Sequence, residues 1–238
     1  MRLLAVAGSR NVVVEGSGRL VMESGSLHGL AMTQQARAQP AGVVLPRTIA
    51  LVGLMGAGKT AIGKRLAARL GLPFVDADVE IEAAAGCTIE EYFVRHGEAE
   101  FREGERRVIG RLLERPVHIL ATGGGAFIDR VTRSLMRERV FSIWLRAELD
   151  LLVARTARRT NRPLLKHGDP REILANLMAV RYPIYAEADL TIDSEDGALD
   201  EMVERVLVAI ESRLGNALPR HCAPAESEDA VKLTKARP

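Results

Sequence analysis

Few aromatic residues, little net charge and no long apolar run are the first features of this sequence. Phe, Trp and Tyr together make up only 4% of 238 residues, which leaves little material for stacking nucleic-acid bases. The formal net charge of +2 is too small for bulk attraction to a polyanion or a membrane surface. No apolar run approaches the roughly 20 residues of a membrane-spanning helix. We therefore expect neither a nucleic-acid partner nor a membrane partner.

Cysteine is also scarce, because Cys87 and Cys222 are the only two in the chain. Neither has a second Cys or His at a metal-ligand spacing, and two distant cysteines do not make a disulfide framework. Free thiols are typical of a reducing compartment. The sequence therefore favours a cytoplasmic location.

The two ends of the chain differ in composition from the middle. Residues 1–46 are rich in Gly, Ser and Ala and show no sustained hydrophobic period. We expect a flexible extension over residues 1–46, one folded domain over 47–215 and a disordered tail over 216–238. The apolar segment "RLLAVAG" is shorter than a usual signal-peptide core. Two alternatives stay open for the extension: an organellar transit peptide, and a native start at Met32.

Between these ends, short apolar segments alternate with helical patterns. The expected strands lie within residues 48–53, 73–78, 117–125, 139–145 and 188–193. The expected helices lie within residues 59–70, 79–85, 89–113 with a break at His96-Gly97, 130–137, 149–159, 170–182 and 199–214. Apolar strands joined by helices predict an α/β fold, a three-layer parallel sheet of about five strands with helices on both faces. In such sheets, ligands bind beyond the carboxyl ends of the strands.

The segment "GLMGAGKT" fits the pattern G-x-x-x-x-G-K-[ST] between an expected strand and an expected helix. Glycines allow consecutive backbone N–H groups to surround phosphate oxygens, and the helix N-terminus adds the positive end of its dipole. Lys59 is predicted to reach the β- and γ-phosphates, and the Thr60 hydroxyl to bind Mg²⁺. The predicted nucleotide-binding residues are Gly53, Leu54, Met55, Gly56, Ala57, Gly58, Lys59 and Thr60.

The phosphate loop alone does not name the reaction, because GTPases, ATPases and small-molecule kinases share it. The third strand ends in Thr122 and three glycines, without an acid, so Asp76 and Asp78 at the end of "FVDAD" are the candidate carboxylates. Two carboxylates at this spacing on a strand end point in different directions, one toward Mg²⁺ and the other toward a second substrate. The chain has no N-K-x-D base-reading motif, which disfavours a GTPase.

Five motifs in order carry a family resemblance: "GLMGAGKT", "DADVEIE", "GEAEFREGE", "ATGGGAF" and "RTARRTNRPLL", followed by "RYPIY". With them the chain resembles the shikimate kinase family, P-loop enzymes of the nucleoside-monophosphate-kinase fold type, over residues 48–214. The resemblance implies ATP-dependent phosphorylation of the 3-hydroxyl of shikimate in aromatic amino acid biosynthesis. It implies ATP and shikimate as ligands, Mg²⁺ as cofactor and a monomer.

The resemblance also implies roles for residues around the second substrate. Arg102 and Arg181 match the family's carboxylate-binding arginines, a task that suits the bidentate guanidinium. Asp78 matches the carboxylate that accepts hydrogen bonds from the substrate hydroxyls, as general base or orienting group. Asp76 matches a residue held near Mg²⁺ through water. The loop that lets the substrate approach the backbone is matched by Gly123, Gly124 and Gly125.

A basic segment without acids runs from Arg155 to Lys166, and Asn161-Arg162-Pro163 interrupts its helical pattern. We expect a mobile flap over about residues 155–170. In the family this segment is the lid that closes over ATP. Arg162 matches its transition-state arginine and Arg155 a residue near the adenine. The predicted catalytic residues are Lys59, Asp78 and Arg162.

Simpler interpretations remain for several of these residues. Arg102 lies among glutamates, including Glu105, which resembles a family residue that pairs with a site arginine; a solvated ion-pair face is the alternative. Arg181 could instead neutralise a helix C-terminus. A gluconate-type kinase on the same fold and an ATP-binding regulator without turnover are the rival functions. The presence of Asp78 and Arg162 disfavours the regulator.

Overall fold

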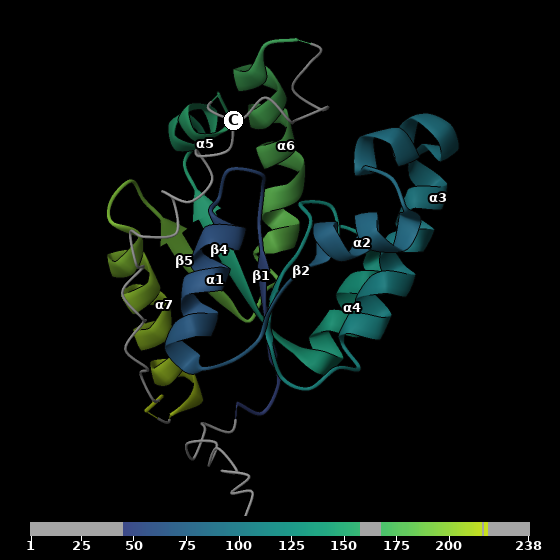
Figure 1. Cartoon of the computed structure of the whole chain (residues 1–238). Helices are drawn as coiled ribbons and strands as arrows, with labels where there is room; N and C mark the ends of the chain where they lie inside the picture. Colours follow the sequence, from purple (N-terminus) through teal and green to yellow (C-terminus); the bar gives the residue numbers. More distant parts are fainter. Residues whose placement is uncertain (1–44, 158–167, 216, 219–238) are drawn as a thin grey trace, which may run out of the picture. The chain divides into compact units, whose positions relative to one another are not determined.

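Five parallel strands form the centre of the structure (Figure 1), a computed structural model that describes residues 45–157, 168–215 and 217–218. The order across the sheet is β2-β3-β1-β4-β5, and each neighbouring pair is parallel. The strands are β1 (Thr48–Val52), β2 (Phe74–Asp76), β3 (Ile119–Ala121), β4 (Val140–Ala147) and β5 (Leu190–Ser194). The predicted α/β fold with a parallel sheet of about five strands is confirmed.

Helices cover both faces of the sheet (Figure 1). They are α1 (Lys59–Leu70), α2 (Ala77–Ala85), α3 (Ile89–Leu112), α4 (Arg130–Arg139), α5 (Leu149–Ala157), α6 (Pro170–Tyr185) and α7 (Leu199–Leu214). α1 and α7 pack against each other on one face. α4 and α6 lie on the other face, where α4 contacts β4 and Tyr182 of α6 packs edge-on against Trp144. The three layers predicted from the alternating pattern are therefore present.

Polar side chains mark where several helices begin. Asp76 caps α2 by accepting from the Asp78 N–H at 3.1 Å. Thr88 and Glu91 form a reciprocal capping box at the start of α3. Asp129 caps α4 by accepting from the Thr132 N–H at 2.9 Å. Such caps satisfy N–H groups that have no partner in the first turn of a helix.

Two helices test the predicted boundaries. The predicted break at His96-Gly97 is confirmed, because Gly97 has φ 78° and ψ 178° inside α3. The predicted end of the sixth helix at Tyr182 is wrong, because α6 continues through Pro183 to Tyr185. Proline removes a helical hydrogen bond, but Tyr185 is buried beneath this turn and bonds to a neighbouring loop. The packing of Tyr185 thus outweighs the tendency of Pro183 to end the helix.

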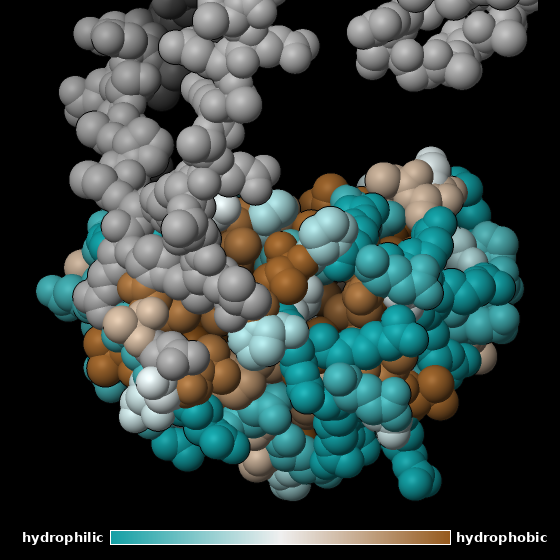
Figure 2. Space-filling model, turned by 90° about the horizontal axis from the view of Figure 1, so that it is seen from below, coloured by the Kyte–Doolittle hydropathy of each residue, from teal (hydrophilic) through white to brown (hydrophobic). Residues whose placement is uncertain are grey.

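The hydrophobic core lies on both sides of β1, whose five residues are all buried. Among the residues that the structure describes, the exposed large apolar side chains are single residues on five different helices: Val79, Val94, Val131, Val180 and Val208. On the face seen in Figure 2, hydrophobic residues show in small groups between hydrophilic ones. Within the described ranges, none of the helices combines the length and the apolar composition needed to cross a bilayer.

Candidate active site

Two loops meet at the carboxyl ends of the neighbouring strands β1 and β3. Thr122 binds the end of β3 to β1, because its N–H and its hydroxyl both donate to the Leu51 carbonyl, at 3.2 and 3.0 Å. The chain leaves β1 toward α1 on one face and β3 toward α4 on the other. A methyl group built on Gly124 would lie 3.7 Å from the Gly53 carbonyl oxygen and 3.8 Å from the Met55 nitrogen. This is the topological switch point, where open α/β sheets bind ligands.

The loop after β1 is the predicted phosphate loop, residues 53–60. The Lys59 Nζ donates to the carbonyls of Gly53 and Leu54, at 2.8 and 3.0 Å, so the ammonium lies over the loop backbone. Gly58 precedes α1 with φ 94°, a backbone conformation that glycine adopts at little cost. The N-terminus of α1 therefore opens onto the loop, as an anion site requires.

Thr60 and Asp76 are brought together from α1 and the end of β2. The Thr60 hydroxyl donates to Asp76 Oδ2 at 2.9 Å, and Asp76 Oδ1 accepts from the Asp78 N–H. Hydroxyl and carboxylate oxygens beside a phosphate site are the hard ligands that Mg²⁺ prefers, usually together with waters and substrate phosphates. The donor set therefore fits the predicted Mg²⁺ assignment of both residues.

Asp78 lies in the first turn of α2, not at the end of a strand as predicted. The strand ends at Asp76 because that carboxylate caps the helix. The two carboxylates still diverge, since Asp76 bonds to Thr60 while Asp78 Oδ1 lies beside the triple-glycine loop. A methyl group built on Gly123 would lie 2.5 Å from Asp78 Oδ1. Glycine at this position is what lets the carboxylate lie against the loop backbone.

Arg102 reaches the same loop from α3. Its Nη1 donates to Glu105 Oε2 at 2.6 Å and its Nη2 to Glu98 Oε1 at 3.2 Å. A methyl group built on Gly125 would overlap the guanidinium, 2.5 Å from Nη2. The pair with Glu98 is exposed, as the solvated ion-pair alternative describes, whereas the pair with Glu105 is not, because Glu105 is only 1% exposed. Arg102 is held between a buried carboxylate and the triple-glycine loop.

For both Arg102 and Glu105, burial and ion pairing shift the pKa in opposite directions. Burial raises the pKa of Glu105 above its usual value, although Arg102 lowers it and Asp78 adds to the rise. Burial also lowers the pKa of Arg102, but Glu105 and Glu98 together outweigh this effect and the net shift is upward. Arg102 therefore keeps its positive charge in a partly dry site.

Arg181 and Tyr185 approach the loop from α6. The Arg181 Nη1 and the Tyr185 hydroxyl both donate to the Gly124 carbonyl, at 3.1 and 2.5 Å. Burial raises the pKa of Tyr185 to about 12, although Arg181 lowers it, so the phenol keeps its proton. Arg181 thus lies at the same loop as Arg102 and Asp78. In the alternative interpretation, Arg181 would neutralise the C-terminal end of its helix; its hydrogen bond to Gly124 is instead a contact with the triple-glycine loop.

Arg155 lies on the other side of the phosphate loop, at the end of β5. Its Nη1 donates to the Ser194 hydroxyl at 2.9 Å and to the Gly56 carbonyl at 3.4 Å, and its Nη2 donates to the Glu195 carbonyl at 2.6 Å. The Ser194 hydroxyl in turn donates to the Ala57 carbonyl at 3.1 Å. The predicted lid arginine, Arg162, lies outside the described residues.

Two residues of this site are absent from the sequence-based prediction. Tyr185 had a detectable signal, because it follows Arg181 by four residues and shares its helical face. Ser194 had only the weak signal of ending an apolar strand, where parallel sheets place functional groups. Nothing in the sequence pairs Ser194 with a loop 137 residues away.

Comparison with known proteins shows that the chain is similar to shikimate kinases. The family model for shikimate kinase matches residues 55–211. The chain is 61% identical to the shikimate kinase of Paramagnetospirillum magneticum over 161 residues, 68% of this chain and 83% of that relative. It is 52% identical to that of Rhodopseudomonas palustris over 174 residues, 73% and 86% of the two chains. Among solved structures it is similar to a shikimate kinase from Acinetobacter baumannii in complex with shikimate: TM-score 0.68, 40% identity, 70% and 93% coverage.

Proposed function

This chain belongs to the shikimate kinase family, and we propose that its site transfers the γ-phosphoryl group of ATP to the 3-hydroxyl of shikimate. The products are shikimate 3-phosphate and ADP, in the route to aromatic amino acids. One arrangement carries the proposal: Asp78, Arg102 and Arg181 surround the triple-glycine loop, which adjoins the phosphate loop. A small hydroxylated acid needs both fixed cations and a hydroxyl acceptor, and these side chains supply them.

The residues around the triple-glycine loop recognise the acceptor. Arg102 and Arg181 bind the ring carboxylate, for which guanidinium groups offer paired, permanently charged donors. The backbone at Gly123 leaves space for Asp78 to accept from the hydroxyl that is phosphorylated. Asp78 orients this oxygen and can take its proton as the phosphoryl group moves.

The phosphate loop supplies alignment and charge, which are what phosphoryl transfer chiefly requires of a protein. Backbone N–H groups of residues 53–60 bind the phosphates, and Lys59 neutralises charge on the β- and γ-groups. Arg155 holds the loop at its adenine side through Gly56 and Ser194. Arg162, outside the described residues, is assigned by its sequence motif to the migrating phosphoryl group.

Thr60 and Asp76 would hold the magnesium ion, Thr60 directly and Asp76 through water. When bound there, Mg²⁺ would neutralise part of the negative charge of the phosphate groups. The chain prepares for it by holding the Thr60 hydroxyl against Asp76 and by fixing Asp76 through the N-cap of α2.

The experiment is an acceptor screen of the full chain with Mg²⁺ and ATP. ADP release should depend on shikimate, and mass spectrometry should show one added phosphoryl group on it. Gluconate and nucleoside monophosphates, the acceptors of related kinases, should give only background release. A preference for either acceptor over shikimate would overturn the proposal.

Three variants test the assigned roles. Asp78→Asn should lower kcat on the order of 10²–10⁴-fold while calorimetry still shows ATP binding, and Lys59→Met should remove most turnover while the fold survives. Arg102→Ala should weaken shikimate binding and leave ATP binding intact. Full turnover in Asp78→Asn, or loss of ATP binding in Arg102→Ala, would contradict the assignments.

A further inference from the structure

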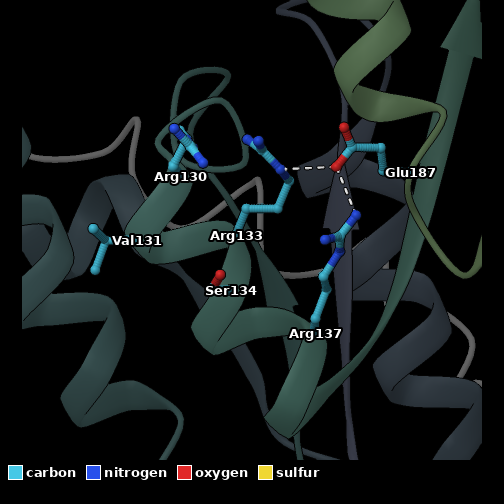
Figure 3. A pocket seen from close by; sticks show the side chains of 6 residues that line it. All are labelled: Arg130, Val131, Arg133, Ser134, Arg137 and Glu187. Atoms are coloured by element: carbon cyan, nitrogen blue, oxygen red, sulfur yellow. Dashed lines mark hydrogen bonds and ion pairs between the residues drawn. The ribbon is translucent and has the colours of Figure 1, made fainter.

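Arg133 of α4 folds back over the start of its own helix to bind the loop that precedes it. Its Nη1 donates to the carbonyls of Phe127 and Ile128, both at 2.9 Å. Its Nε pairs with Glu187 at 2.9 Å, and only 12% of the Arg133 side chain is exposed. One guanidinium therefore connects the loop before α4 to the turn between α6 and β5. The groove where this happens is a surface hollow of about 500 Å³ (Figure 3).

The loop that Arg133 binds is the continuation of the triple-glycine loop. The Ile128 N–H donates to the Gly125 carbonyl at 3.0 Å, and the Ala126 N–H donates to the Gly123 carbonyl at 3.3 Å. The segment from Gly123 to Ile128 is thus one set of tight turns. A shift at Phe127 and Ile128 moves the backbone against which Asp78 and Arg102 lie.

Glu187 fixes the outer end of Arg133. Its Oε2 accepts from Arg133 Nε and from Arg137 Nη2, at 2.9 and 2.7 Å, and Figure 3 shows both contacts as dashed lines that meet at this carboxylate. Arg137 shares the carboxylate and the helix face, but 54% of its side chain is exposed. Within the described chain, Arg137 forms no hydrogen bond to the loop backbone, so it offers a matched control.

We propose that Arg133 is a positioning residue for the shikimate site: it holds the segment 123–128 in the place that Asp78 and Arg102 require. This inference rests on the proposed function for its kinetic effect. A charge-assisted hydrogen bond to each of two carbonyls restrains the loop more strongly than neutral bonds do. Arg133 forms its hydrogen bonds and its ion pair, within the described residues, with Phe127, Ile128 and Glu187 and with no residue of the phosphate loop, so we expect its loss to affect shikimate binding more than ATP binding.

Kinetics of Arg133→Ala and Arg137→Ala test the proposal. In Arg133→Ala, the KM for shikimate should rise about tenfold, with KM for ATP within about twofold of the parent. Arg133→Lys should recover part of the loss, because one ammonium can reach the two carbonyls but cannot also replace Nε at Glu187. Arg137→Ala should behave as the parent enzyme. Equal changes in both KM values, or equal effects of the two alanine variants, would overturn the proposal.

Amide hydrogen exchange tests the loop without any turnover. Arg133→Ala should speed exchange at Ala126 and Ile128, whereas Arg137→Ala should not. Unchanged exchange at both amides in Arg133→Ala would overturn the proposal, even in an active enzyme. If the parent chain failed to phosphorylate shikimate, the proposed function would fall, and exchange would still decide whether Arg133 holds the loop.

Discussion

The guanidinium of Arg102 and the carboxylate of Glu105 lie 2.6 Å apart, one turn along α3. Glu105 is almost fully buried, whereas 21% of the Arg102 side chain is exposed. The buried partner therefore orients the accessible one. This geometry gives Arg102 a fixed direction before any substrate arrives, which lowers the entropy lost on binding.

Replacing Glu105 with Gln should weaken shikimate binding. Arg102 would keep its charge but lose the ionic partner that fixes it, so we expect the Kd for shikimate to rise about tenfold, or ~1.4 kcal/mol. ATP affinity should not change. Calorimetry with each ligand measures both. The matched control is Glu103→Gln, which removes the exposed partner of Arg107 on the same helix; equal effects of the two variants would contradict the orienting role.

Glu105 should also make stability depend on pH. Burial raises its pKa in the folded state above 4.5, so the folded chain binds this proton more tightly than the unfolded chain does. Its contribution to the free energy of unfolding should then decrease as pH rises above about 4.5, until the pH passes the folded pKa. Urea unfolding of the parent and of Glu105→Gln across this window measures the difference. A parent that gains stability relative to Glu105→Gln as the pH rises through this window would contradict the shift.

Gly125→Ala should disturb the shikimate site by displacing Arg102. The new methyl group would overlap both terminal nitrogens of the guanidinium, so the arginine must move away from the loop. We expect a rise in KM for shikimate of about tenfold or more and little change for ATP. Gly104→Ala is the control, because its nearest neighbour would be the Tyr92 hydroxyl at 4.0 Å. Wild-type KM in Gly125→Ala would show that Arg102 does not need this position.

Ser194→Ala should weaken ATP binding and leave shikimate binding unchanged. The buried hydroxyl donates to Ala57 and accepts from Arg155, so its loss leaves a carbonyl of the phosphate loop without a donor. We expect about 1–3 kcal/mol lower stability and ATP affinity reduced about threefold to tenfold, with shikimate affinity unchanged. Ser194→Thr keeps the hydroxyl on a strand-forming residue and should retain ATP affinity. An Ala variant that binds ATP like the parent would refute the role of Ser194.

Much of the architecture could be predicted because its signals are local. Apolar runs bounded by turns marked five strands, and Gly97 marked the break within α3. The phosphate loop was predictable because glycine spacing, Lys59 and Thr60 lie within eight consecutive residues. The end of α6 was not predictable, since Pro183 is a local stop signal that the packing of Tyr185 outweighs.

The acceptor side was predictable in its residues but not in its contacts. Asp78, Arg102 and Arg181 follow from motif order, yet Asp78 belongs to a helix and not to a strand end. In the sequence, Gly125 is one of three glycines of an expected loop. Only the fold shows that the Arg102 guanidinium occupies the space where a methyl group on Gly125 would lie. Nothing in the sequence indicated a positioning role for Arg133, because its helix contains several other arginines.

The sequence by itself determined the strands, the helices, the phosphate loop and the identity of the charged groups, since each depends on residues near one another in the chain. Only the tertiary structure decided which part of the backbone each guanidinium group lies against: Arg102 at Gly125, Arg181 at Gly124 and Arg155 at Gly56. The physical reason is that these pairs depend on strand order and helix placement, and hydrophobic packing of distant segments sets both.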